Sequence, residues 1–194
     1  GEAFRTLDEA KIVRLIYPTT DLHPQLKADL KKAPRLQFLD TGLVNYSLGI
    51  QAEMLPMDDL NSAYKGAVIP HLITQELISL QSISAHTPNF WVREKAQSNA
   101  EVDLLYAYGK FVIPIEIKSG STGSLKSLHQ FIEAADHPYA IRMYAGAFKV
   151  EQAVTPNKKP YLLMNLPYYA GTMLHQYVEW FLQQKIETEV SNLL

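Results

Sequence analysis

The chain has 194 residues, a formal net charge of −2, 47% hydrophobic and 20% charged residues, and no cysteine. This length and composition fit one well-packed domain with at most a small appendage. The lack of cysteine excludes disulfides, thiolate nucleophiles and cysteine-ligated zinc. No apolar run reaches the roughly 18 residues needed to cross a bilayer, and no signal peptide is recognisable, so we expect a cytoplasmic protein with no membrane partner.

The first 20 residues predict a short helix over 2–10 followed by a strand over 11–20. The helical pattern is already under way after Gly1, no capping residue precedes it, and the chain does not start with methionine. We therefore expect the sequence to be a fragment cut from a longer protein.

The segment over 21–40 is rich in basic residues and poor in acids. Its cationic side chains are Lys27, Lys31, Lys32 and Arg35. Such a run is typical of a solvated connector, and that is our interpretation. The alternative is an edge that contacts nucleic-acid phosphates, because a local basic patch can bind a polyanion even when the net charge is negative.

The central part of the chain alternates helical and strand-like segments. A strand over 35–40, a short helix over 43–49 closed by Gly49 and a longer helix over 61–80 precede strands over 89–95, 100–109 and 110–120. Pro70 interrupts the longer helix, so either that helix starts near Ile69 or it is kinked at the proline. Tyr108 and Gly109 predict the tight turn between the last two strands.

The remainder predicts a helix over 124–136 with Ser124 as its N-cap, a strand over 140–148, a loop over 151–160, a strand over 161–167 and an amphipathic helix over 174–186. Strands that alternate with helices along the chain are typical of α/β proteins. We therefore expect an α/β fold with a mixed central sheet flanked by helices.

Each strand of the hairpin over 101–118 has one apolar and one charged face. Alternation places Val102 and Leu104 on the same face of the first strand, opposite to its two acids. In the second strand, Ile113, Ile115 and Ile117 share a face. The charged side chains therefore collect on the other face of the hairpin; they are Glu101, Asp103, Glu116 and Lys118.

Clustered carboxylates on one face of a sheet favour a divalent cation. With the predicted turn, Glu101 lies directly opposite Glu116, and Asp103 lies on the diagonal. Mg²⁺ or Mn²⁺ binds one or two carboxylates together with water and phosphate oxygens. Lys118 would point into the same space and orient the attacking water. The alternative interpretation is an exposed hairpin whose charges form surface ion pairs of little energetic value.

Asp103, followed after twelve residues by Glu116-Ile117-Lys118, resembles the D…ExK core of PD-(D/E)XK nucleases. Four ordered segments resemble signatures of one uncharacterised domain family: FLDTGLVNYSLG, YKGAVIPHLITQEL, FWVREKAQSNAEVDLL and IPIEIKSGSTGSLKSLHQF. In that family an AAA-type P-loop ATPase domain and a winged helix come first, and a nuclease-like domain ends the chain. The resemblance covers roughly residues 10–175.

The resemblance implies a restriction-endonuclease-like fold for residues 21–194. Residues 1–20 would be the remnant of the winged helix, with the ATPase domain missing. It implies that Asp103, Glu116 and Lys118 are catalytic, and that the two carboxylates hold Mg²⁺ or Mn²⁺. Glu101 would be an auxiliary metal ligand, and the basic side chains over 21–40 would contact nucleic acid. No G-x-x-x-x-G-K motif occurs, so we expect no ATP site in this chain.

One position departs from the family pattern. Related nucleases carry a glutamate on the helix before the hairpin, four residues after a glycine, and counting from Gly66 this position is Pro70. Glu76 is the nearest acid, but six residues turn a helix by about 600°, so it lies on another face. Two hypotheses remain open: a metal-dependent nuclease acting on DNA or RNA, and a catalytically inactive module of the same fold. The second would bind nucleic acid or protein and regulate the ATPase.

Overall fold

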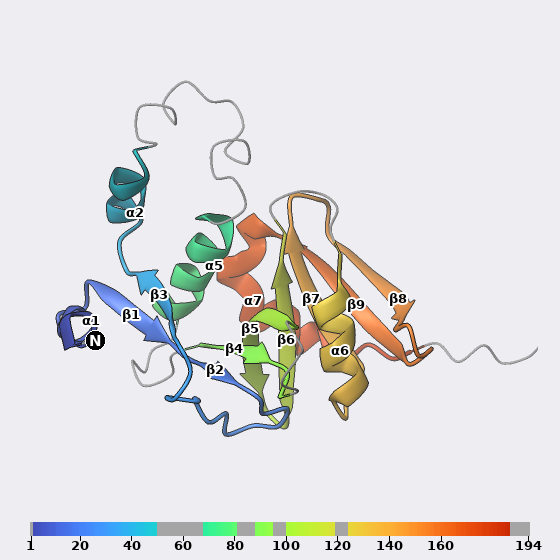
Figure 1. Ribbon diagram of the computed structural model, residues 1–194. Helices are drawn as coiled ribbons and strands as arrows, with labels where there is room; N and C mark the ends of the chain where they lie inside the picture. Colours follow the sequence, from blue (N-terminus) through green and yellow to red (C-terminus); the bar gives the residue numbers. More distant parts are fainter. Residues whose placement is uncertain (1, 50–67, 81–87, 95–99, 119–123, 187–194) are drawn as a thin grey trace, which may run out of the picture.

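A seven-stranded mixed β-sheet forms the centre of the structure, a computed structural model that describes residues 2–49, 68–80, 88–94, 100–118 and 124–186 (Figure 1). The strand order is β2 (Pro18–Thr19), β4 (Asn89–Val92), β5 (Glu101–Tyr108), β6 (Phe111–Ile117), β7 (Tyr139–Tyr144), β9 (Pro160–Pro167) and β8 (Lys149–Val154). β2 runs parallel to β4, and β4, β5 and β6 alternate in direction. β6, β7 and β9 are parallel, and β8 is antiparallel to β9. The predicted α/β class with a mixed central sheet is confirmed.

Helices cover both faces of this sheet (Figure 1). α6 (Lys126–Ala134) packs on one face through Leu128, Phe131 and Ile132, all of which are fully buried. α5 (Val68–Ser79), the 3₁₀ helix η1 (Tyr168–Met173) and α7 (Leu174–Phe181) pack on the other face. Because apolar residues are buried on both faces, β6 and β7 are apolar along most of their length. Among the described residues, no helix is long and apolar enough to span a bilayer.

The N-terminal part of the chain contributes to two sheets. α1 (Glu2–Glu9) precedes β1 (Val13–Ile16), which pairs antiparallel with β3 (Arg35–Phe38) in a separate two-stranded sheet. The strand predicted over 11–20 is therefore two strands, because β2 pairs with β4 in the central sheet. α2 (Thr41–Leu48) follows β3 and ends at Gly49, whose φ of 68° confirms the predicted glycine stop.

Side-chain hydrogen bonds connect the small sheet to α5. Gln37 Nε2 donates to the backbone oxygen of His71 (3.1 Å), and Gln75 Nε2 donates to that of Leu39 (2.9 Å). α5 begins at Val68, so Pro70 lies in its first turn, where a proline breaks no helical hydrogen bond. This confirms a helix start near Ile69; the expected helical residues 61–67 lie outside the described residues.

Two local predictions are wrong. β8 forms at Lys149–Val154, where a loop over 151–160 is expected. This strand lies at the edge of the sheet and is largely exposed, so its sequence lacks the apolar alternation that identifies a strand. Ser124 is not the N-cap of α6: the helix begins at Lys126, with Leu125 at the N-cap and no capping hydrogen bond from a side chain.

Candidate functional site

The β5–β6 hairpin has a different register from the predicted one. Tyr108 pairs with Phe111, so the turn consists of Gly109, which has a φ of +57°, and Lys110. The predicted turn at Tyr108 and Gly109 is therefore wrong, and each residue of β5 pairs two residues farther along β6. A shift of two residues leaves every side chain on its face. Continuing the observed register by one residue places Asp103, and not Glu101, directly opposite Glu116.

A β-bulge in β5 adjoins Asp103. Val102 pairs with Trp91, and Leu105 pairs with Asn89, so a three-residue step on β5 faces a two-residue step on β4. The extra residue changes the alternation. Val102 packs in the core on the α6 side of the sheet, whereas Leu104 packs in the core beneath α5 and α7. The prediction that these two side chains share a face is therefore wrong.

The carboxylate of Asp103 is held in place by backbone and side-chain groups. Its Oδ2 accepts a hydrogen bond from the backbone N–H of Ile117 at 2.8 Å. Its Oδ1 lies 3.8 Å from Nη2 of Arg35, and 24% of the side chain is exposed. One oxygen of Asp103 is thus fixed to β6, and the other has only a long ionic contact and partial access to solvent.

Glu116 is the most buried acid of the site, with 8% of its side chain exposed. Oε1 accepts a hydrogen bond from Nζ of Lys118 at 2.5 Å. Oε2 is buried and has no hydrogen-bond partner among the described residues. Burial, helped by the negative charge of Asp103, raises the pKa of Glu116 to about 7, although Lys118 and Arg35 act in the opposite direction.

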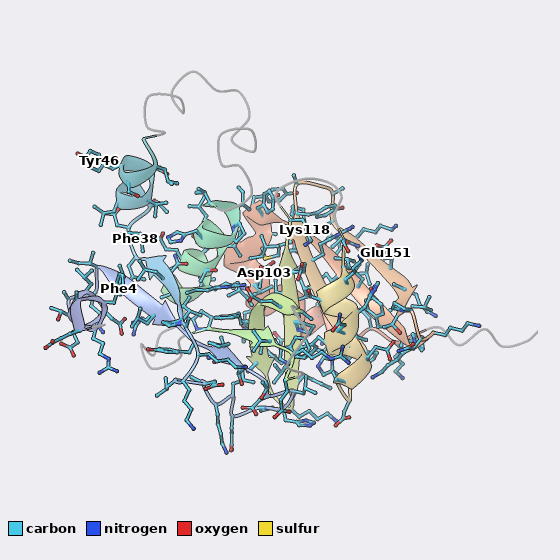
Figure 2. The ribbon with its side chains drawn as sticks, viewed as in Figure 1. Phe4, Phe38, Tyr46, Asp103, Lys118 and Glu151 are labelled. Atoms are coloured by element: carbon cyan, nitrogen blue, oxygen red, sulfur yellow. The ribbon has the colours of Figure 1, made fainter. Side chains whose placement is uncertain are left out.

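The backbone of Lys118 is anchored on both sides. Its N–H donates to the backbone oxygen of Met143 on β7 (2.9 Å), and its own oxygen accepts a hydrogen bond from the hydroxyl of Tyr168. The bond to Met143 extends the pairing of β6 and β7 by one residue, and the bond from Tyr168 ties Lys118 to η1. The ammonium group reaches Glu116 from this anchored position. Figure 2 shows Lys118 and Asp103 on the central strands.

Arg35 enters the site from β3, in the other sheet. Its Nη1 donates to the backbone oxygen of Asp103 (2.9 Å), its Nη2 pairs with Glu101, and the guanidinium lies 4.2 Å from the ring centre of Phe90. Burial lowers the pKa of Arg35, although Asp103 and Glu116 act against this effect. The interpretation of Arg35 as part of a solvated connector is wrong, since 37% of its side chain is exposed and its donors are engaged in the site.

The remaining basic residues of the connector are placed differently. Lys27, Lys31 and Lys32 are exposed, and Lys32 forms an ion pair with Asp29 at 3.8 Å. The sequence signal that separates Arg35 from them is its position at the start of the strand RLQF, which commits the side chain to a sheet. The acids and cations of the site therefore come from two sheets that are distant along the chain.

Two carboxylates fit a divalent cation. Asp103 and Glu116 lie on neighbouring strands, close enough for the charge of Asp103 to act on Glu116, and Oε2 of Glu116 is a buried acceptor with no hydrogen bond from the described residues. Mg²⁺ typically binds one or two protein carboxylates and completes its six ligands with water and substrate oxygens. Within the described ranges, no group of three or more His, Cys, Asp or Glu side chains is arranged around a common point. Glu101 is engaged by Arg35 and would reach the ion only after leaving that pair.

Within the described residues, no further acid joins Asp103 and Glu116 in place of the helix glutamate. Pro70 occupies the first turn of α5, and Gly66 lies outside the described residues. Glu76, two turns later, is half-buried on α5. The site on the hairpin thus consists of two carboxylates, the lysine of the D…ExK pattern and the arginine from β3.

Comparison with known proteins identifies part of this region. A family model described as "Domain of unknown function (DUF4143)" matches residues 65–160. This match includes α5, the whole β5–β6 hairpin, α6, β7 and β8. No curated protein and no solved structure matches the chain. Residues 65–160, which contain Asp103, Glu116 and Lys118, are therefore similar to an uncharacterised domain family.

Proposed function

We propose that this domain is a metal-dependent phosphodiesterase that acts on DNA or RNA. The observation that carries the proposal is that Asp103 and Glu116 lie on neighbouring strands of the hairpin, close enough for the charge of Asp103 to raise the pKa of Glu116, with the ammonium group of Lys118 on Glu116. The order of elements fits the fold that the sequence resemblance implies: three antiparallel strands (β4, β5, β6) are followed by a helix (α6) and a parallel strand (β7).

The chemistry would be hydrolysis of a P–O bond. The oxygen of a water molecule forms the new bond to phosphorus, its proton passes to solvent or a base, and the leaving oxygen departs and takes up a proton. A Mg²⁺ or Mn²⁺ ion would lower the pKa of the water and offset charge at the phosphoryl oxygens. Asp103 and Glu116 would hold the ion. Lys118 would keep a positive charge beside the attacked phosphate and orient the water through its N–H donors.

The sequence resemblance also gives this activity a setting. In the resembled family the nuclease-like domain follows an AAA-type ATPase domain and a winged helix. We therefore propose that the domain works as the C-terminal part of a larger ATPase and that residues 1–20 derive from the winged helix. β1 and β2, both within residues 1–20, pair with β3 and β4. Any motion of the preceding domains would thus be transmitted to β3, which carries Arg35.

A second candidate function is a non-catalytic module that binds nucleic acid or protein. The observation that favours it is the ion-pair network of the site: Arg35 engages Glu101 and Asp103, and Lys118 engages Glu116. Two cations therefore already offset much of the carboxylate charge without a metal ion. In this alternative the network stabilises the hairpin and Pro70 marks the loss of a third metal ligand.

The deciding experiment is Mn²⁺ binding by calorimetry, followed by cleavage assays on single-stranded and duplex DNA and RNA. We expect the wild-type chain to bind one Mn²⁺, and the Asp103→Asn, Glu116→Gln double variant, which is nearly isosteric, to bind none. A control double variant, Glu9→Gln with Glu179→Gln, removes the same charge at exposed positions and should bind Mn²⁺ normally. Equal Mn²⁺ binding by the wild-type and the site variant, or none by either, would reject the nuclease and favour the second candidate.

A further inference from the structure

A row of polar residues continues the site across the sheet. Glu116 on β6 pairs with Arg142 on β7, Arg142 pairs with Asn165 on β9, and Asn165 pairs with Lys149 on β8. Directly paired residues point to the same face of a sheet. Two residues before Arg142 and Asn165, Ala140 and Leu163 pack in the α6-side core, so the row lies on that face. It is close to the C-terminal ends of β6, β7 and β9.

Three neighbouring members of this row have unsatisfied buried atoms. Oε2 of Glu116, Nε of Arg142 and Oδ1 of Asn165 are each buried without a hydrogen-bond partner among the described residues. Asn165 is only 1% exposed, and Glu116 only 6%. A buried polar atom without a partner costs on the order of 1–3 kcal/mol, so three such atoms on adjacent strands mark a place where a further polar group would bind favourably.

The side chain of Arg142 is positioned by an aromatic ring. Its guanidinium carbon lies 4.6 Å from the ring centre of Tyr144, two residues farther along β7. The ring is fixed in turn, because its hydroxyl donates to the backbone oxygen of Ala147 at 2.6 Å. Gly146 also packs directly against the ring, since a Cβ at that position would lie 2.3 Å from it. Arg142 is thus held in one orientation by stacking.

Glu151, an acid on β8 that senses the charge of Arg142, is engaged by two other side chains. Glu151 accepts hydrogen bonds from Nζ of Lys149 and from Nδ2 of Asn165 (2.9 Å). These two bonds, the first being the stronger, lower the pKa of Glu151, and the charge of Arg142 contributes less. The buried Nε of Arg142 has no hydrogen-bond partner among the described residues, and a guanidinium offers several N–H donors that suit an oxyanion.

We propose that Arg142 binds a backbone phosphate of a nucleic-acid strand, next to the phosphate at Asp103 and Glu116. The proposal rests on the proposed function for its ligand class. Adjacent strands are about 4.8 Å apart, so Arg142 is one strand away from Glu116, and a nucleic-acid backbone lying along the row would present successive phosphates to the two positions. Arginine suits this role because its donors bind two phosphate oxygens at once. Figure 2 shows the direction of the row, from Asp103 on the central strands to Glu151 near the β8 edge.

Binding of oligonucleotides at several salt concentrations tests this assignment. The probes are fluorescein-labelled 20-nucleotide single-stranded DNA, single-stranded RNA and duplex DNA, measured by anisotropy without divalent metal. We expect Arg142→Gln to weaken binding of the tightest probe by roughly tenfold and to reduce the slope of log K against log salt by about 0.7 to 0.9, the contribution of one phosphate. Arg142→Lys should keep most of the slope, and Arg5→Gln, which removes an exposed arginine on α1, should change neither quantity.

Two results would overturn the proposal. One is a slope of log K against log salt that is the same in Arg142→Gln as in the wild-type, with Arg142→Lys measured alongside as the check on folding. The other is failure of all three probes to bind a wild-type chain that binds Mn²⁺. Its failure is distinct from that of the proposed function. If the wild-type chain does not bind Mn²⁺ but its oligonucleotide binding depends on Arg142, the nuclease proposal is rejected and the phosphate site is kept.

Discussion

The Asp103 carboxylate accepts a hydrogen bond from the backbone N–H of Ile117, at 2.8 Å, on the opposite strand of the hairpin. The same residue therefore acts as a structural bridge between β5 and β6 and as a candidate metal ligand. Its bulge position explains why the bond forms to a side chain: the irregular strand leaves the ladder there without its usual backbone partner.

This double role separates two substitutions of Asp103. Asp103→Asn can still accept the hydrogen bond from Ile117, whereas Asp103→Ala leaves that N–H without its acceptor. We expect Asp103→Ala to lower the free energy of unfolding by about 2 kcal/mol more than Asp103→Asn does, while both variants lose Mn²⁺ binding. Urea denaturation and calorimetry measure the two quantities. Equal stability of the two variants would mean that the bond to Ile117 is not important for the fold.

The raised pKa of Glu116 predicts a specific pH dependence of stability in the metal-free protein. The pKa is about 7 in the folded chain and 4.5 for an ordinary glutamate. Between these values the folded protein keeps a proton that the unfolded chain releases, so the free energy of unfolding falls as pH rises through this window, by about 3 kcal/mol in total. The glutamate contribution is fully favourable below about pH 4.5 and is lost above about pH 7.

Glu116→Gln should abolish that fall. We expect the variant to be less affected by pH between 5 and 7.5 and to become more stable than the wild-type at pH 8, as measured by thermal unfolding in the presence of EDTA. Glu179→Gln, at an exposed position on α7, should keep the wild-type profile. Parallel curves for the wild-type and Glu116→Gln would show that Glu116 is ionised throughout the window.

In the proposed metal site, Arg35 would compete with the ion for the carboxylates of Glu101 and Asp103. Removing its charge with Arg35→Gln should tighten Mn²⁺ binding by about tenfold, because a unit charge about 5 Å away opposes a divalent cation even in a water-like dielectric. The lost bonds to Glu101 and to the backbone of Asp103 should lower the free energy of unfolding by about 1–2 kcal/mol. Calorimetry checks the first effect, with Arg5→Gln as the matched control. Weaker Mn²⁺ binding in Arg35→Gln would instead identify Arg35 as a residue that positions Asp103.

Lys118 distinguishes catalysis from metal binding. In Lys118→Met we expect cleavage of nucleic acid to fall by at least about 100-fold, since the variant lacks the charge and the N–H donors beside the phosphate. Mn²⁺ affinity should change only a few-fold, because both carboxylates remain. Lys110→Met, an exposed lysine in the turn of the same hairpin, is the control. The predicted role of Lys118 would be wrong if Lys118→Met cleaved at the wild-type rate.

The sequence predicts the hairpin and its charged residues, because alternation over 101–118 is a local property. Alternation does not identify the turn, because Tyr108-Gly109 and Gly109-Lys110 are both plausible two-residue loops. Either loop contains Gly109, the residue with the positive φ. The bulge beside Asp103 arises from pairing with β4, which is distant in the chain, so alternation within β5 gives no sign of it.

The sequence alone does not identify Arg35 and Arg142 as neighbours of the hairpin. Arg35 reaches Asp103 across 68 residues from another sheet, and no local pattern reports such a contact. Arg142 reads as an isolated charge in the strand AIRMYAGAF; only the parallel pairing of β6 with β7 shows that it lies beside Glu116. The composition of residues 21–40 indicates a basic segment, but it does not identify which of the basic side chains contacts the hairpin.

β2 is only two residues long, yet it covers the outer edge of β4. Asn89 Nδ2 donates to the backbone oxygen of Tyr17 (3.0 Å), which adds a side-chain link along the same boundary. A shortened protein that begins at residue 21 would leave the backbone N–H and C=O groups of β4 open to pairing with other molecules, and uncovered edges of this kind promote aggregation. Concentration-dependent light scattering should appear in that shortened protein and be absent from the full chain. We therefore expect the first 20 residues to prevent self-association through β4.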